Sequence, residues 1–112
     1  MSRKLDVYRL ALELARQIRR LLPDIQRFDR DLATQLRKAT TSVPLNISEA
    51  LRRRGRDRGH LLSIALGSAA EVQAILDVSI AMELFEPDSV TELEPTIDRI
   101  CAMLYRLRGK AP

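Results

Sequence analysis

Five arginines lie within seven residues near the middle of this 112-residue chain, the densest cluster of charged side chains in the sequence. The arginine cluster consists of Arg52, Arg53, Arg54, Arg56 and Arg58. A guanidinium group binds phosphate or carboxylate oxygens through paired N–H donors. Glycines at positions 55 and 59 place the cluster in a turn, and the first residues of the following helix add a dipole that attracts anions. The pattern predicts a phosphate-binding turn or a solvated charged surface, and the sequence leaves both interpretations open.

Side chains that support catalysis are scarce. His60 is the single histidine and lies beside the arginine cluster, where we expect it in solvent. None of Glu49, Glu71 or Glu83 has a histidine three positions later, the spacing of metal-binding pairs in helical bundles. The single cysteine, Cys101, lies on the predicted buried side of a helix and is expected to be structural. We therefore expect no enzyme activity, no metal and no cofactor.

Polar residues on either side of the cluster also admit two interpretations. They are Asn46, Glu49, Ser68 and Glu71. Polar side chains inside a bundle more often fix the register between helices than bind a ligand. We expect a structural or interface role for these four residues, and the same role for Arg37, Pro44 and Gly67.

The elements that position these residues are predicted to be four helices. Hydrophobic residues make up 46% of the chain, with four glycines and five prolines, which favours helices over turn-rich β structure. Apolar residues recur every three or four positions, which predicts four helices. The first covers residues 4–22, and the second runs from a cap at Asp29 or Asp31 to about residue 50. The third covers about 57–85 and the fourth 89–109. Short connections predict an all-α, antiparallel, up-down-up-down four-helix bundle that forms a single domain over residues 1–112.

Two prolines affect the predicted first and second helices. Pro23 follows the first apolar stripe and is predicted to end that helix. Pro44 lies inside the second stripe, so we expect a kink rather than a break. The hydroxyl groups of Thr40, Thr41 and Ser42 are expected to bind backbone groups that the proline leaves free.

The third and fourth helices have different apolar patterns. The third, with Asp57 as its expected N-cap, carries apolar residues on more faces than one core requires, which indicates a subunit interface. The fourth begins with Ser89 and Glu92 at the spacing of a capping box and continues as a narrow apolar seam. The third helix is therefore the predicted interface helix.

An antiparallel second and third helix also imply a register. If they meet about position 55, facing residues have numbers that sum to about 110. This register sets Glu71 near Arg37 and Lys38, and Ser68 beside Ser42.

Charge is unevenly distributed along the chain. Residues 1–58 carry 15 basic and 7 acidic groups (+8), whereas residues 59–112 carry 4 and 8 (−4). One cysteine, no secretory signal at the N-terminus and no run of 18 apolar residues predict a cytoplasmic protein that does not enter a membrane.

Three blocks carry a resemblance to a known family. LDVYRLALELA, QLRKATTSVPLNISEA and IALGSAAE are similar to the bacterial four-helix-bundle proteins encoded within intervening sequences of 23S ribosomal RNA genes. The matching positions are Gln35, Leu36, Arg37, Ala39, Ser42, Pro44, Asn46, Ile47, Glu49, Ala65, Gly67, Ser68 and Glu71. Ala50 stands where the family usually has glycine, and Leu66 replaces an arginine, which weakens a nucleic-acid face on the third helix. The arginines at 52–54 can compensate.

The resemblance adds to the functional expectation. A related branch contains the accessory proteins of diversity-generating retroelements, basic pentameric barrels that bind nucleic acid and a reverse transcriptase. We therefore expect a non-enzymatic homo-oligomer, with a pentamer favoured, that binds nucleic acid, with RNA favoured, through the arginine cluster. The alternative is a protein-interaction scaffold that docks a partner such as a reverse transcriptase. Gene neighbourhood would separate the two.

Overall fold

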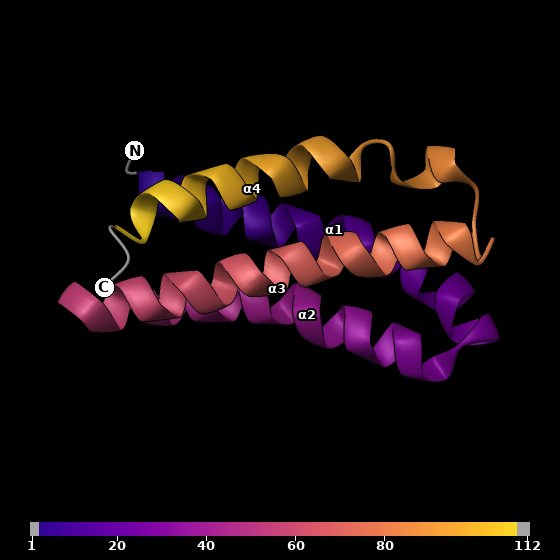
Figure 1. The fold of residues 1–112 in the computed structure, drawn as a ribbon, viewed down its shortest axis with the longest axis horizontal. Coiled ribbons are helices and arrows are strands. Elements are labelled where there is room, and N and C mark those ends of the chain that lie inside the picture. Colours follow the sequence, from indigo (N-terminus) through magenta and orange to yellow (C-terminus); the bar gives the residue numbers. More distant parts are fainter. Residues whose placement is uncertain (1–2, 110–112) are drawn as a thin grey trace.

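Residues 3–109 fold into four α-helices whose neighbours run antiparallel, which confirms the all-α four-helix bundle. The computed structural model describes residues 3–109. The elements are α1 (Arg3–Phe28), α2 (Arg30–Ala50), α3 (Gly55–Ala81), the short 3-10 helix η1 (Pro87–Val90) and α4 (Leu93–Leu107). Helix α1 packs against α2 and α4, and α3 packs against the same two helices (Figure 1). The α2–α3 connection lies at the same end of the bundle as the start of α1 and the end of α4.

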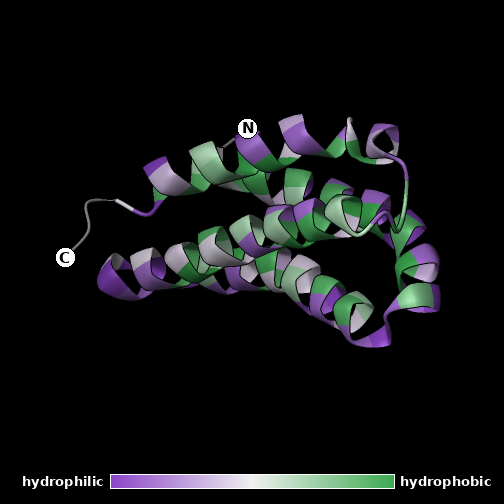
Figure 2. Ribbon diagram, turned by 45° about the vertical axis from the view of Figure 1, so that its right-hand side comes forward, coloured by the Kyte–Doolittle hydropathy of each residue, from purple (hydrophilic) through white to green (hydrophobic). Residues whose placement is uncertain are grey.

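The core is made of the apolar stripes that the sequence predicts. Hydrophobic and hydrophilic residues alternate around the helices (Figure 2), so each helix turns one stripe inward. The largest fully buried side chains are Leu14, Ile18, Ile25, Leu36, Ile47, Leu76, Ile97, Ile100, Leu104, Val7, Val43 and Val72. Burial of these aliphatic groups is the main force that holds the four helices together.

The prediction that Pro23 ends the first helix is wrong. Helix α1 continues through Pro23 to Phe28. Pro23 and Arg19, whose carbonyl the proline leaves free, are both exposed, so water can satisfy that carbonyl. Two residues later Ile25 is fully buried. Burying this side chain favours continuation of the helix beyond the proline.

Helix α2 runs unbroken through Pro44, as predicted, and changes direction along its length (Figure 1). The expected compensation is wrong in detail. The Thr41 hydroxyl donates to the carbonyls of Arg37 and Lys38, at 3.0 and 3.2 Å, rather than to the carbonyl that Pro44 leaves free. The Thr40 hydroxyl is buried and has no partner among the described residues. The helix is therefore held by the burial of Pro44 and its neighbours, not by these hydroxyl groups.

Two predicted caps are wrong and one is confirmed. The Asp29 carboxylate accepts a hydrogen bond from the Leu32 backbone N–H at 2.9 Å and caps α2, as predicted. Asp57 does not cap α3, because that helix already begins at Gly55 and Asp57 lies in its first turn. Ser89 does not begin α4, since it belongs to η1 and α4 begins at Leu93.

Helix α3 also ends earlier than predicted, at Ala81 rather than about 85. Glu83 adopts a left-handed backbone conformation with φ of 60°, which turns the chain out of the helix. The N–H of Leu84 then donates to the carbonyl of Ser79 at 2.9 Å. This bond satisfies one of the last carbonyls of α3.

The expectation that no segment is apolar enough for a membrane needs correction at α3. Its length and a mean hydropathy of 1.5 over its most apolar window would suffice for a membrane span. A core helix of a soluble protein passes the same test, and α3 buries seven residues against the other helices. Length and hydropathy alone therefore do not assign α3 to a membrane.

Candidate nucleic-acid interface

The arginine cluster lies at one end of the bundle, around the turn that joins α2 to α3. Helix α2 ends at Ala50 and α3 begins at Gly55, so residues 51–54 form the turn. Gly55 has φ of +61°, a left-handed conformation that glycine adopts without strain. Figure 2 shows this end of the α2–α3 pair as hydrophilic. The turn therefore presents its charged side chains at a single end of the molecule.

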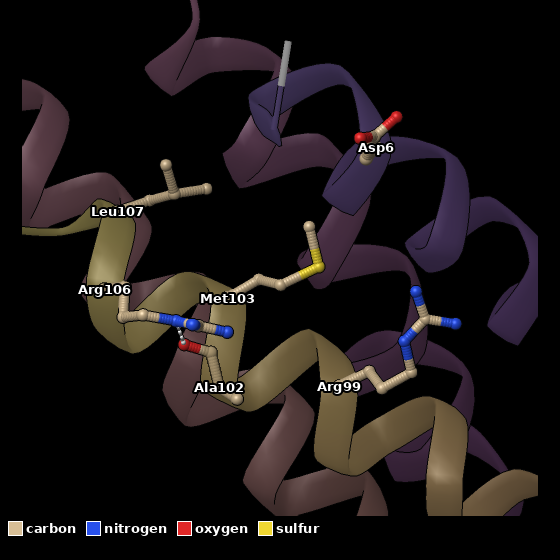
Figure 3. Close-up of a pocket in the computed structure, with 6 residues that line it drawn as sticks. All are labelled: Asp6, Arg99, Ala102, Met103, Arg106 and Leu107. Atoms are coloured by element: carbon tan, nitrogen blue, oxygen red, sulfur yellow. Dashed lines mark hydrogen bonds between the residues drawn. The ribbon is translucent and has the colours of Figure 1, made fainter. Parts of the chain in front are cut away.

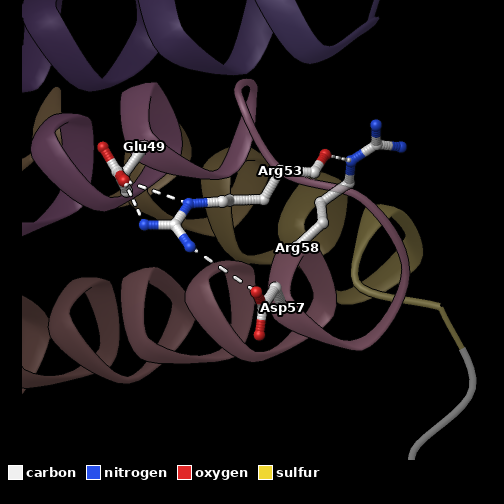
Figure 4. A network of polar contacts seen from close by, with 4 residues as sticks. All are labelled: Glu49, Arg53, Asp57 and Arg58. Carbon is white, nitrogen blue, oxygen red and sulfur yellow. Dashed lines mark hydrogen bonds and ion pairs between the residues drawn. The ribbon is translucent and has the colours of Figure 1, made fainter.

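Arg53 is held by two carboxylates. Its Nε and Nη2 donate to Glu49 Oε1 at 3.1 and 2.8 Å, and its Nη1 lies 3.5 Å from Asp57 Oδ2 (Figure 4). The hydrogen bond and the charge of Glu49 raise the pKa of Arg53 above its ordinary value. Arg53 thus links the last turn of α2 to the first turn of α3, and its charge is largely balanced by its neighbours.

Arg58 closes the same turn from the other side. Its side chain is half-buried, and its Nε donates to the backbone carbonyl of Arg53 at 3.0 Å (Figure 4). Carbonyls just after a helix end have no intrahelical partner, so this bond satisfies one of them. Arg53 and Arg58 therefore shape the turn.

The other three arginines of the cluster have a different environment. Arg52, Arg54 and Arg56 are exposed. Within residues 3–109 their guanidinium groups form no hydrogen bond or ion pair to another residue. Arg54 is the N-cap residue of α3 and Arg56 lies in its first turn, where the helix dipole also favours anions, whereas Arg52 lies in the turn before it. These three side chains are the part of the cluster that can bind phosphate groups.

The predicted register between α2 and α3 is confirmed by a polar group halfway along the pair. The hydroxyl oxygens of Ser42 and Ser68 lie 2.7 Å apart. Asn46 Nδ2 donates to the Ser42 carbonyl at 2.8 Å and to the Ser42 hydroxyl at 2.9 Å. The Ser42–Ser68 contact joins the two helices at the predicted register, and Asn46 bonds to Ser42 within α2.

The remaining predicted residues lie apart from this polar group. Glu71, Arg37 and Lys38 are all exposed, and in the described part of the chain Glu71 forms no ion pair with either basic residue. Gly67 is exposed, with open space where a Cβ would lie. Glu49 belongs to the turn with Arg53 rather than to this group. The structure therefore does not bring the seven expected structural residues together at one site.

The histidine and the cysteine lie in different environments. His60 is exposed. Burial and, to a smaller extent, the charge of Asp98 raise the pKa of the half-buried Cys101 thiol, which disfavours the reactive thiolate. No group of three or more His, Cys, Asp or Glu that could hold a metal ion occurs among the described residues.

Sequence reasoning missed a groove between α1 and α4. It has a volume of about 460 Å³ and is lined by Asp6, Arg99, Ala102, Met103, Arg106 and Leu107. Figure 3 shows the two guanidinium groups on either side of the Met103 side chain. The Nε of Arg106 donates to the Ala102 carbonyl at 3.4 Å. The groove joins residues from both ends of the chain, so no local motif could indicate it.

Comparisons with known proteins agree with this fold. Residues 3–106 match the family described as 23S rRNA-intervening sequence protein. A similar solved structure is that of a protein of unknown function from the S23 ribosomal protein family of Bacteroides thetaiotaomicron, with a TM-score of 0.86 and 23% identity. The similarity covers 97% of this chain and 100% of the other. No curated protein matches the chain.

Proposed function

The chain belongs to the 23S rRNA-intervening sequence protein family, and we propose that it is a non-enzymatic, oligomeric nucleic-acid-binding protein whose ligand is RNA. The observation that supports this proposal is the exposure of Arg52, Arg54 and Arg56 at one end of the bundle. Among the described residues no partner engages the donors of these guanidiniums, whereas those of Arg53 are engaged by carboxylates.

The proposed binding is mainly electrostatic. Free guanidinium groups bind phosphate oxygens, and such contacts fix position without reading sequence. The chain has two tyrosines, two phenylalanines and no tryptophan, so few bases can stack on it. Binding should therefore depend strongly on salt and weakly on base sequence.

The salt dependence of RNA binding tests this proposal. For single-stranded RNA, the logarithm of the affinity should fall against the logarithm of the salt concentration with a slope of about −0.7 per phosphate neutralised. Fluorescence anisotropy with labelled oligonucleotides of different base composition gives this slope. Absence of binding at low salt, or a slope near zero, would refute the proposal.

Oligomerisation through α3 is the second part of the proposal. Two apolar side chains on α3, Ile64 (39%) and Val78 (45%), and that of Met82 (57%) directly after it are well exposed in a single chain. Leu45 on the neighbouring α2 is 67% exposed. Contact between such surfaces of several copies would remove them from water. A ring-shaped oligomer, with a pentamer favoured, would also allow several arginine clusters to contact one RNA strand.

The same exposed apolar residues support a second candidate function, a protein-interaction scaffold. In that case α3 and Leu45 would contact a partner protein such as a reverse transcriptase, and the free arginines would meet an acidic surface or serve solubility. A neighbouring reverse-transcriptase gene, together with no RNA binding at low salt, would favour this candidate.

A further inference from the structure

The last turn of α4 carries an exposed aromatic ring with an arginine held against it. Tyr105 is 61% exposed. The guanidinium carbon of Arg108 lies 4.5 Å from the centre of the Tyr105 ring, a cation–π distance. Arg108 lies over one face of the ring, and Tyr105 remains largely exposed beside it.

The end of α4 that carries this pair lies next to the start of α3, where the arginine cluster ends, although the two segments are distant in sequence. A Cβ added at Gly59 would meet the carbonyl oxygen of Arg108 at 2.7 Å, so the end of α4 packs directly on the start of α3. Gly59 is only one turn along α3 from Arg56, a free arginine of the cluster. Figure 4 shows the end of α4 in the same region as the turn.

The Arg108 guanidinium packs against the Tyr105 ring. Its Nε is buried and has no hydrogen-bond partner among the described residues. The described contact of its guanidinium is therefore the Tyr105 ring. An arginine on one face of a tyrosine orients the ring and leaves the other face free for a second planar group.

We propose that Tyr105, backed by Arg108, is a stacking site for one unpaired base of single-stranded RNA. The proposal rests on the proposed function, because the arginine cluster would hold the phosphates of the same strand. A base–aromatic stack tolerates any base, since every base has a π face. The site adds affinity without adding sequence specificity.

Tyrosine fluorescence gives a direct test, because Tyr8 and Tyr105 are the two tyrosines and tryptophan is absent. A Tyr8→Phe protein reports on Tyr105 alone. Titration with single-stranded oligouridylate should quench its emission, after correction against free tyrosine amide in the same RNA solution. Inorganic polyphosphate, which has phosphates but no bases, should bind without this quenching and should compete with the RNA.

Affinity measurements supply an independent readout. Tyr105→Ala should weaken oligouridylate binding by at least about fivefold, the lower end of what one stacked base contributes, and leave the salt slope unchanged. Tyr105→Phe should bind as the wild type does. Phe28→Ala is the matched control, because Phe28 is an exposed aromatic residue (67%) at the opposite end of the bundle.

The outcomes separate this proposal from the one on which it rests. RNA binding with a steep salt slope but no base-dependent quenching, or wild-type affinity in Tyr105→Ala, overturns the stacking site and leaves the phosphate-binding cluster in place. If neither RNA nor polyphosphate binds the wild type, both proposals are wrong. Circular dichroism of each variant shows that its helices are intact.

Discussion

At the scale of single residues, neighbours give the five clustered arginines two different roles. Arg53 lies four positions after Glu49 and four before Asp57, so both carboxylates reach it along or across the turn. Arg58 donates to the backbone of Arg53. The spacing of Arg53 from Glu49 is that of a stabilising helix pair and could have predicted its ion pair. No local pattern predicts the bond of Arg58, because it depends on the path of the turn.

Glycines 59 and 67 give a paired prediction at this scale. In Gly59→Ala the new Cβ would lie 2.7 Å from the Arg108 carbonyl oxygen, a backbone atom that cannot move away freely. We expect the free energy of unfolding to fall by about 1–3 kcal/mol, as in other overpacked sites. Urea denaturation measures this change.

Gly67→Ala is the matched control, since Gly67 is also within α3 but has open space at the Cβ position. Replacing a helical glycine by alanine should here raise stability by roughly 0.5–1 kcal/mol. Equal effects of the two substitutions would contradict the close packing of α4 on Gly59. A loss of stability in Gly67→Ala would show that another surface packs on that glycine.

At the scale of the elements, apolar periodicity predicts the four helices well and their ends poorly. Stripes such as Leu36, Val43 and Ile47 are buried as expected, because they depend on helix geometry alone. Pro23 did not end α1, because burial of Ile25 outweighs the missing hydrogen bond. Ser89 and Glu92 have the spacing of a capping box, but η1 occupies that position. Several neighbouring residues can each begin or end a helix, and a sequence pattern does not decide which of them does so.

The N-cap of α2 gives a prediction at this scale. The Asp29 carboxylate accepts a hydrogen bond from the Leu32 N–H at 2.9 Å. Asp29→Ala removes that acceptor and should lower the free energy of unfolding by about 1 kcal/mol. Asp31→Ala is the control, because Asp31 lies exposed in the first turn and is not the cap. Equal unfolding midpoints for the two variants in urea would show that Asp29 does not stabilise α2.

At the scale of the whole molecule, charge is separated along the bundle. The arginine cluster lies at one end, and the connection from α3 to α4 lies at the other (Figure 1). Residues 82–98, which include that connection, contain six acidic and no basic residues. The sequence predicted this asymmetry and the bundle, because both follow from composition and periodicity. It could not predict the packing of the end of α4 on Gly59 or the groove between α1 and α4, which depend on tertiary packing.

The oligomer is a prediction at this scale. Light scattering should give a mass close to five times the 12.7 kDa of one chain. Val78→Glu should lower that mass, because it places a charge on the exposed apolar face of α3. Tyr105→Ala, which changes a more exposed residue on a different helix, should not lower it. A wild-type mass of 12.7 kDa would contradict the oligomer.

The central claim is that the free arginines of the cluster bind RNA phosphates, and a comparison of two triple variants with equal charge tests it most directly. One variant replaces Arg52, Arg54 and Arg56 with alanine. The other replaces the exposed arginines Arg19, Arg20 and Arg30, which lie away from the cluster on α1 and at the start of α2. Both lose three positive charges, so a difference between them reports position rather than net charge.

The measurement is the affinity for single-stranded RNA as a function of salt. The cluster variant should bind every sequence more weakly, and its log–log slope should flatten by about 2, the value for three lost phosphate contacts. The control variant should keep nearly the wild-type slope, and both should keep their helical circular dichroism. Equal slopes for the two variants, or a cluster variant that binds as the wild type does, would contradict the account.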